Sequence, residues 1–383
     1  MTRLAQANRI LYVEPWAYLR PILRRLRMGD VRKEEWLGQR LTEVRPQLHV
    51  FRPPLWIPRA DGSWVERLTL ALFVRMLRRI LGQLGFRNPI LWLFLPDMGV
   101  FVGRFGEKLV IYHVVDEYAA YSGMTARWRP VVEHMEEELA RQADLVFVTS
   151  PMLMASKARF SERVTLVPNA VDYKTFAAVR DSGAPIPADV DSGSRPVIGY
   201  IGAINDKVDL PLLAQVARHY PDWVLLLVGP VLLTDPESLT ALTALRGLPN
   251  VRLVGRQDVT DVPRYIMACD VCLLPYRVND WTRHIDSLKI YEYLACGKPV
   301  VASQVPTAQC CGDLIAIAPS ADEFVEMIGQ ARTADTLILR KKRQELAERN
   351  TWDERVELLS AAISQRLREK HKSSVLLQGE WSG

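Results

Sequence analysis

Short apolar segments alternate with helical segments along most of the chain, and this alternation restricts the folds open to it. The second half has strand-like segments at residues 197–201, 223–228, 251–254, 271–274 and 300–302. The first half has them at residues 10–13, 48–51, 90–95, 109–113, 145–148 and 164–167. Strands that alternate with helices form a parallel sheet covered by helices on both faces. The sequence therefore predicts an α/β protein with two Rossmann-like parallel-sheet domains.

A small, polar segment separates the two halves. Residues 181–195 are rich in Pro, Gly, Ser and Asp, as an exposed linker is. We therefore expect a first domain over residues 1–180, a second over 196–352, a further helix over 353–370, and a disordered polar tail at 371–383. Open parallel sheets bind ligands at the carboxyl ends of their strands, so the predicted site is a cleft that these ends face.

The charge is concentrated at one end of the chain. The 383 residues carry a formal net charge of +5, yet residues 1–90 alone hold 17 Lys and Arg against 7 Asp and Glu. A basic region of this kind suits nucleic acid, anionic lipid or an anionic substrate. No zinc-finger, helix-turn-helix or aromatic RNA-binding signature accompanies it, so we do not expect nucleic acid as a partner.

Residues 66–86 predict an amphipathic helix in which Arg75, Arg78 and Arg79 lie among large apolar residues. Such a helix is either packed on the domain surface or lies on a membrane surface. No apolar run is long enough to span a membrane, and the first residues lack a signal peptide, so we expect a cytoplasmic protein. Cys269 and Cys272 have the spacing of a redox or metal pair, but they flank an apolar strand without other ligands, which favours core packing.

Lys289 is predicted to lie at the beginning of a helix, where a positive charge is unfavourable. With Asp286 or Ser287 as the N-cap, Lys289 falls in the first turn, where the helix dipole makes a cation unfavourable by roughly 0.3–1 kcal/mol. A bound anion removes that penalty, so Lys289 and the amides of Ser287, Leu288 and Lys289 predict a phosphate site. Glu292 lies on the same helical face. A solvated Lys289–Glu292 ion pair is the alternative.

Small residues recur where the predicted strands of the second half end. Gly202 follows the first of these strands, Gly229 follows the second, and Gly255 with Arg256 ends the third. Glycines let a backbone approach a phosphate closely, although a tight turn also explains Gly202. Lys207 follows the first of these strands and is a second phosphate candidate, or a solvated lysine in a loop. The repetition favours a ligand-binding edge.

Several ordered motifs resemble one enzyme family. DSLKIYEYLACGKPVVAS at 286–303, ACDVCLLPY at 268–276 and the PNAVD at 168–172 are similar to segments of group 1 glycosyltransferases with the GT-B fold. The resemblance covers roughly residues 90–366. It implies two Rossmann-like domains that face a cleft, with the acceptor bound by the first, a nucleotide-sugar by the second, and a last helix that crosses back to the first domain.

The resemblance also implies roles for single residues. The glutamate that matches Glu292 accepts hydrogen bonds from the donor ribose, and charge-assisted bonds of this kind are worth about 1.5–3 kcal/mol when shielded. Lys289 then neutralises the diphosphate leaving group. The family has another glutamate where this chain has His284, so its role near the sugar can pass to His284, to Asp286, or to no residue. Asp116 matches the position that orients the acceptor or takes its proton, although it can also cap a turn.

The sequence thus predicts a glycosyltransferase of the hexosyltransferase type. The expected donor is a nucleotide-diphosphate sugar, and the expected acceptor is a glycan or a polyprenyl-linked glycan reached at the inner face of the membrane. Retention at the anomeric carbon is what the family implies. No cofactor or metal is expected, because the acidic run 133–138 indicates a solvated helix face. A nucleotide-binding scaffold without activity and a sugar-nucleotide epimerase are the alternatives.

Overall fold

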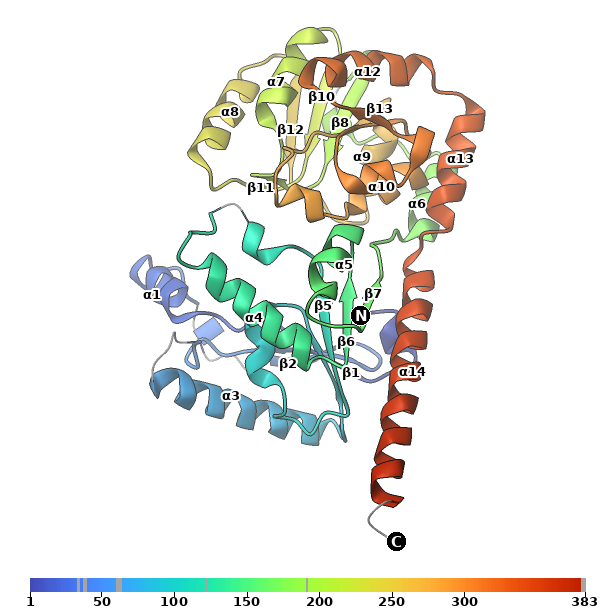
Figure 1. Ribbon diagram of the computed structural model, residues 1–383. Coiled ribbons are helices and arrows are strands. Elements are labelled where there is room, and N and C mark those ends of the chain that lie inside the picture. The colour runs from blue at the N-terminus through green and yellow to red at the C-terminus, as the bar shows by residue number, and fades with distance from the viewer. Residues whose placement is uncertain (33–34, 37–39, 60–63, 122, 191, 380–383) are drawn as a thin grey trace. The chain divides into compact units, whose positions relative to one another are not determined.

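The computed structural model describes residues 1–32, 35–36, 40–59, 64–121, 123–190 and 192–379 (Figure 1). Its contacts divide the chain into two compact units. Unit 1 comprises residues 1–93, 98–111 and 365–383, and unit 2 comprises residues 94–97 and 112–364.

Unit 1 contains a three-stranded sheet of order β1-β3-β2. Strand β1 (Ile10–Val13) pairs in parallel with β3 (Leu48–Arg52), but β2 (Arg40–Arg45) is antiparallel to β3. The short β2–β3 turn contains Gln47 with a φ of 66°. Because so short a turn joins neighbouring strands only in antiparallel orientation, β2 adds an antiparallel strand to the predicted parallel pair of β1 and β3.

Helices α1 (Leu19–Arg27) and α3 (Trp64–Gln83) belong to unit 1. Helix α3 confirms the helix predicted near residues 66–86, and it buries Phe73, Leu77 and Ile80 in the core of the unit. The ring of Trp16 stacks on Phe73 with centroids 4.5 Å apart. Helix α3 is therefore packed on one face, as the first of the two alternatives required.

A second sheet has the order β4-β5-β6-β7. In unit 1, β4 (Ile90–Leu93) lies beside the beginning of β5 (Leu109–Val114). In unit 2, the end of β5 lies beside β6 (Leu145–Val148), which pairs in parallel with β7 (Val164–Leu166). The predicted strands of the first half are thus present, but they belong to two sheets.

Unit 2 is built around a six-stranded sheet whose described pairs are all parallel. Its order is β12-β10-β8-β13-β14-β15. The strands are β8 (Val197–Ile201), β10 (Val224–Val228), β12 (Val251–Gly255), β13 (Val271–Leu274), β14 (Val300–Ser303) and β15 (Ala316–Ala318). From β8 the strand order runs outward through β10 to β12 on one side, and from β13 it runs outward through β14 to β15 on the other, so the order reverses between β8 and β13. Open α/β sheets bind ligands at such a switch point.

Helices cover both faces of this sheet (Figure 1). One group of helices that contact one another contains α7 (Leu210–His219), α8 (Pro236–Arg246) and α12 (Ala321–Thr333). The other contains α6 (Tyr173–Asp181), α9 (Val262–Ala268), α10 (Leu288–Ala295) and α13 (Leu337–Glu348). The strands between them are almost wholly apolar, as strands buried on both faces are.

The remaining elements lie outside the sheets and helices described so far. They are α4 (Arg129–Gln142), α5 (Pro151–Ala158), α11 (Pro306–Gln309), α14 (Trp352–Gly379), β9 (Ile204–Asn205), β11 (Val231–Leu232), and the 3₁₀ helices Leu4–Gln6, Pro96–Phe101, Tyr118–Ala120, Ala188–Val190, Thr282–His284 and Gly312–Leu314. Within the described part of the chain, no helix is long and apolar enough to cross a membrane.

Helix α14 differs from the prediction at its end. We expected a helix over 353–370 and disorder from 371, but the helix continues to Gly379. The segment after 370 has no proline and no glycine before Gly379, so nothing in it interrupts the helix. Residues 380–383 of the predicted tail lie outside the described residues.

The predicted division at residues 181–195 does not coincide with the boundary between the units. Backbone hydrogen bonds join Val171 to Asn350 (3.0 Å) and to Trp352 (3.3 Å), which ties residues before the linker to residues after it. Residues 112–180 therefore belong to unit 2. The assignment of functional domains to 1–180 and 196–352 stays a prediction, and residue 191 of the linker lies outside the described residues.

Candidate active site

Three glycines stand where β8, β10 and β12 end. Gly202, Gly229 and Gly255 all have positive φ, at 151°, 143° and 79°. The amide of Gly202 donates to Val228 (2.7 Å), and the amide of Gly229 donates to Gly255 (2.8 Å). A methyl group on Gly229 would collide with the backbone carbonyl of Gly202. Close approach of neighbouring backbones thus explains these glycines, and Gly202 also leaves space for a lysine.

That lysine is Lys289, in the first turn of α10. A methyl group on Gly202 would collide with the side chain of Lys289. The lysine side chain therefore occupies the space at the end of β8 that any larger residue at position 202 would need. The Lys289 ammonium lies 5.4 Å from the ring centroid of Tyr200 and 6.0 Å from that of Tyr276. The predicted helix start, with Ser287 as N-cap, is confirmed. Lys289 is therefore held at the switch point of the sheet.

Lys207 lies near the same tyrosine. Its ammonium lies 5.2 Å from the ring centroid of Tyr276 and 5.9 Å from that of Trp281. Burial raises the pKa of the Tyr276 hydroxyl, but the charges of Lys289 and Lys207 outweigh burial and hold that pKa below its usual value. The structure thus brings both predicted phosphate-binding lysines together around one buried tyrosine. Neither has an ion pair within the described residues.

The beginning of α10 completes this cationic region. Ser287 is buried, and its hydroxyl lies 3.3 Å from that of Tyr276 rather than capping the helix through its side chain. The amides at the start of an α-helix have no partner within the helix, and they bind anions. The side chain of Leu288 is exposed, so this residue can contribute only its amide to a polar ligand.

Glu292 follows one turn later on α10 and is half-buried. Burial raises the pKa of its carboxyl to about 7, against the lowering effect of Lys289. Among the described residues, Glu292 and Lys289 form no ion pair within 4.0 Å, so the alternative of a solvated pair is wrong. A shielded carboxylate without a protein partner is a suitable acceptor for ligand hydroxyls.

Asp116 follows β5 and joins the same region. Its carboxylate accepts a hydrogen bond from the Tyr121 hydroxyl (2.9 Å), and the Tyr121 ring packs edge-on against Trp281 at 5.3 Å. Burial raises the pKa of Asp116, while the charge of Lys207 acts in the opposite direction. The predicted acidic residue therefore lies beside Lys207, where it can accept a proton or orient a hydroxyl.

Asp286 has a different environment from the one predicted. The Asn169 amide donates to its carboxylate, the Asn169 side chain donates to its carbonyl (2.7 Å), and the Tyr291 hydroxyl lies 3.4 Å from its carboxylate. Burial raises the pKa of Asp286 to about 6. Its polar atoms bind the PNAVD segment, so the geometry gives it a structural role rather than a sugar contact.

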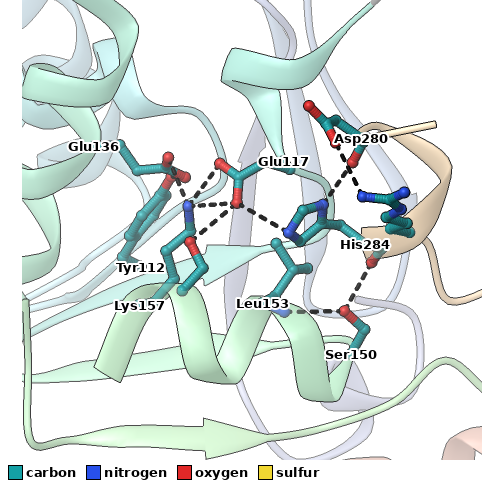
Figure 2. A network of polar contacts seen from close by, with 10 residues as sticks. Tyr112, Glu117, Glu136, Ser150, Leu153, Lys157, Asp280 and His284 are labelled. Atoms are coloured by element: carbon teal, nitrogen blue, oxygen red, sulfur yellow. Dashed lines mark hydrogen bonds and ion pairs between the residues drawn. The ribbon is translucent and has the colours of Figure 1, made fainter. Parts of the chain in front are cut away.

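His284 is also held by the protein (Figure 2). Its Nδ1 lies 2.6 Å from the Asp280 carbonyl, and its own carbonyl accepts a hydrogen bond from the Ser150 hydroxyl (2.7 Å). Its Nε2 lies 3.9 Å from a carboxylate oxygen of Glu117. Arg256, by contrast, is exposed, and no described contact links it to the two lysines.

Sequence reasoning missed several residues of this region. Tyr276 and Trp281 surround the lysines, although no spacing rule marks them. Glu136 was expected on a solvated helix face, but only 2% of it is exposed and it pairs with Lys157. Its position within a run of acidic residues suggested an exposed side chain. The sign that it faces inward is its i, i+3 spacing from the buried Leu139.

Comparisons with known proteins agree with this geometry. Residues 195–333 match the family described as Glycosyl transferases group 1. This segment is similar to members of that family. It contains the six-stranded sheet, both lysines and Glu292. A protein of Bacillus subtilis (strain 168) assigned to teichuronic acid biosynthesis, the glycosyltransferase TuaH, is 30% identical over 226 residues. That match covers 57% of this chain and 56% of TuaH, so the chain spans about half the length of this relative.

Solved structures show the fold, which is GT-B. The trehalose-phosphate synthase of Burkholderia vietnamiensis has a TM-score of 0.65 and 14% identity, with 94% of this chain and 99% of that chain covered. The sucrose-phosphate synthase of Thermosynechococcus elongatus has a TM-score of 0.63 and 22% identity, with 85% of each chain covered. HepE of Anabaena, in complex with UDP and glucose, has a TM-score of 0.63 and 16% identity, with 83% and 86% covered.

Proposed function

We propose that the protein is a glycosyltransferase that moves a sugar from a nucleoside diphosphate donor to a glycan acceptor. The observation that carries the proposal is the pair of ammonium groups of Lys207 and Lys289, which lie 5.2 and 6.0 Å from the ring centroid of Tyr276, beside the start of α10. Two cations and a helix N-terminus at a switch point suit a diphosphate. Glu292, one turn further along α10, suits the ribose hydroxyls. The family match of this segment and the UDP bound in HepE support the same donor class.

A sugar attached to this diphosphate would extend toward the remaining polar groups. Asp116 and Trp281 lie beside Lys207, so the acceptor hydroxyl would meet Asp116 there. Lys289 and Lys207 would stabilise the charge that develops on the diphosphate as the glycosidic bond breaks. Retention of the anomeric configuration follows from the family resemblance and is part of the proposal.

Calorimetric titration with UDP, GDP and ADP tests the donor site. One nucleotide should bind wild type, and Lys289→Met and Lys207→Met should each weaken it by about 10- to 150-fold, the effect of one shielded charge-assisted contact. Lys341→Met is the matched control, because Lys341 is exposed on α13. If no nucleotide binds, or if the three variants bind equally well, the proposal fails.

A nucleotide-binding protein without transferase activity is the second candidate. The contacts of His284 and Asp286 with the protein favour it, because they leave Asp116 as the remaining predicted catalytic group near the lysines. Mass spectrometry of products separates the candidates. Transfer gives a glycosylated acceptor and free nucleotide, a sugar-nucleotide epimerase gives an isomeric donor, and a binding protein leaves the donor unchanged.

The acceptor proposal extends to a lipid-linked glycan at the inner face of a membrane. Helix α3 has a second apolar stripe opposite its core face, formed by Trp64, Leu68 and Leu72, of which Trp64 is 76% exposed. Exposed arginines at 67 and 75 flank this stripe. Aromatic and aliphatic residues beside arginine suit an anionic lipid surface, where each basic residue contributes about 1 kcal/mol.

Vesicle co-sedimentation tests this extension. Wild type should bind vesicles that contain phosphatidylglycerol more strongly than vesicles of phosphatidylcholine, and Leu68→Ser with Leu72→Ser should reduce that binding. Leu337→Ser is the control, because Leu337 is 80% exposed on α13 in unit 2. Equal binding to both kinds of vesicle would remove the membrane from the proposal and leave the donor site untouched.

A further inference from the structure

A buried group of charged side chains lies next to the candidate active site (Figure 2). The ammonium of Lys157 on α5 contacts both carboxylate oxygens of Glu117 (2.8 and 3.0 Å) and one oxygen of Glu136 on α4 (2.7 Å). The Tyr112 hydroxyl donates to the other oxygen of Glu136 (2.9 Å). Lys157 is 1% exposed and Glu136 is 2% exposed. Such a group is costly to bury, so its persistence needs an explanation.

Glu117 is the member of this group that faces the candidate site. It follows Asp116 directly, and the Ser156 hydroxyl donates to its carboxylate (3.1 Å). The same oxygen lies 3.9 Å from Nε2 of His284. Burial raises the pKa of Glu117, but Lys157 and then His284 outweigh burial and lower it. In Glu136, burial prevails over Lys157 and raises the pKa. Glu117 therefore carries the negative charge that meets the imidazole.

The contacts of His284 fix its ring. A carbonyl can only accept a hydrogen bond, so Nδ1 carries the proton in its contact with Asp280. Nε2 is then the nitrogen that faces Glu117, and the carboxylate attracts it in the charged ring, in which Nε2 carries a proton as well. Lys157 and Ser156 hold Glu117 in position. The Ser150 hydroxyl holds the backbone of His284 at the same time. The ring thus has one orientation, three residues after Trp281.

We propose that Glu117 is a positioning residue, which holds the imidazole of His284 in this orientation at the edge of the donor site. Lys157 and Ser156 keep the carboxylate in place, and Glu136 contacts Lys157 on the side away from His284. Glu117 acts on the donor through His284 and does not touch the donor itself. This inference rests on the proposed function for its effect on rate, but its effect on the ring stands on geometry alone.

The chain offers a matched pair of variants. Glu117→Gln removes the charge that faces His284, while its amide oxygen can still accept from Lys157. Glu136→Gln makes the same chemical change on the same lysine, but away from His284. Loss of a group that orients a metal-binding histidine lowers affinity or activity by about 10- to 100-fold, and we take the same range for His284. We therefore expect Glu117→Gln to lower kcat by that factor with unchanged nucleotide affinity, and Glu136→Gln to keep the wild-type kcat.

Nuclear magnetic resonance of ¹⁵N-labelled histidine gives a readout that is independent of turnover. His284→Gln assigns the ring signals, which in wild type should show a protonated Nδ1. The signals should change in Glu117→Gln and stay the same in Glu136→Gln. If Glu117→Gln fails to fold, Ser156→Ala should give the smaller change in the same direction. Equal spectra of wild type and Glu117→Gln, or equal loss of kcat in the two glutamine variants, would overturn the proposal.

A double variant tests whether Glu117 acts through His284. If Glu117 acts through His284, Glu117→Gln combined with His284→Gln should be no slower than His284→Gln alone. Additive losses would show that Glu117 acts in another way. Should wild type transfer no sugar from any donor, the proposed function fails, while the spectra still decide whether Glu117 holds the ring.

Discussion

Replacement of Glu292 by Gln should have opposite effects on stability and on nucleotide binding. The carboxyl of Glu292 has a pKa of about 7 in the folded protein, against an ordinary value of 4.5, because burial disfavours the ionised form. The protonated form is therefore compatible with the fold, whereas the proposed contact with the ribose needs the ionised form. Glutamine keeps the shape of the side chain and removes the ionisation.

The size of the effect follows from the raised pKa. A folded-state pKa above the unfolded value means that the contribution of Glu292 to stability is complete below pH 4.5 and is lost as the pH rises to about 7. The loss is at most about 3 kcal/mol, at 1.36 kcal/mol for each unit of pKa difference. Glu292→Gln escapes this loss, so it should be more stable than wild type at pH 8 and equal to it at pH 4.5.

Nucleotide binding should change in the opposite direction. Only the ionised carboxylate grips a vicinal diol with both oxygens, so wild-type affinity should fall about tenfold for each pH unit below 7. The phosphate of the nucleotide titrates in this range too, but equally for both proteins. The ratio of the wild-type affinity to the Glu292→Gln affinity therefore isolates Glu292, and it should rise between pH 5.5 and 7.5.

Thermal unfolding at several pH values and calorimetry with the bound nucleotide measure the two effects. Glu326→Gln on α12 is the control, because Glu326 is exposed. The reasoning is refuted if Glu292→Gln has the wild-type melting temperature at pH 8, or if the ratio of affinities does not depend on pH. The first result would mean that the carboxyl is solvated, and the second that it does not bind the ribose.

Three further variants test other parts of the structure. Gly229→Ala should destabilise by about 1–3 kcal/mol in thermal unfolding, because its methyl group would collide with the carbonyl of Gly202, whereas Gly247→Ala, which has ordinary contacts, should not. Lys157→Met should destabilise by about 3–5 kcal/mol, because two buried carboxylates lose their partner; wild-type stability would contradict the burial of the group. Asp286→Ala should lower the melting temperature without weakening the nucleotide, and a large loss of affinity would restore Asp286 as a donor contact.

The parts of the fold that local pattern determines were predictable. The five strands predicted for the second half are present because each is a continuous apolar run, and α10 begins after Ser287 and ends before Gly297, which has a φ of 72°. Strand β15 was missed because it has only three residues, and β2 because its charged residues do not resemble a buried strand. The orientation of β2 depends on the turn at Gln47.

The candidate site was only partly predictable for a different reason. Lys289 and Glu292 lie one turn apart on a single helix, so local spacing places them together. The meeting of Lys207 with Tyr276, and of Asp116 with Trp281, depends on which strand ends are neighbours in the folded sheet. The burial of Glu136 depends on a lysine 21 residues later in the chain. Such pairs have no signature in a single sequence.

Because two ammonium groups lie close to its ring, Tyr276 should couple the binding of an anion to the uptake of a proton. An anion bound between Lys207 and Lys289 would offset the charges that hold the pKa of the Tyr276 hydroxyl down, and burial alone would then raise it. At alkaline pH, binding should therefore take up a proton from solution. The heat of binding would then depend on the ionisation enthalpy of the buffer, and the dependence should vanish in Tyr276→Phe. The tyrosine thus reports occupancy of the site without any added label.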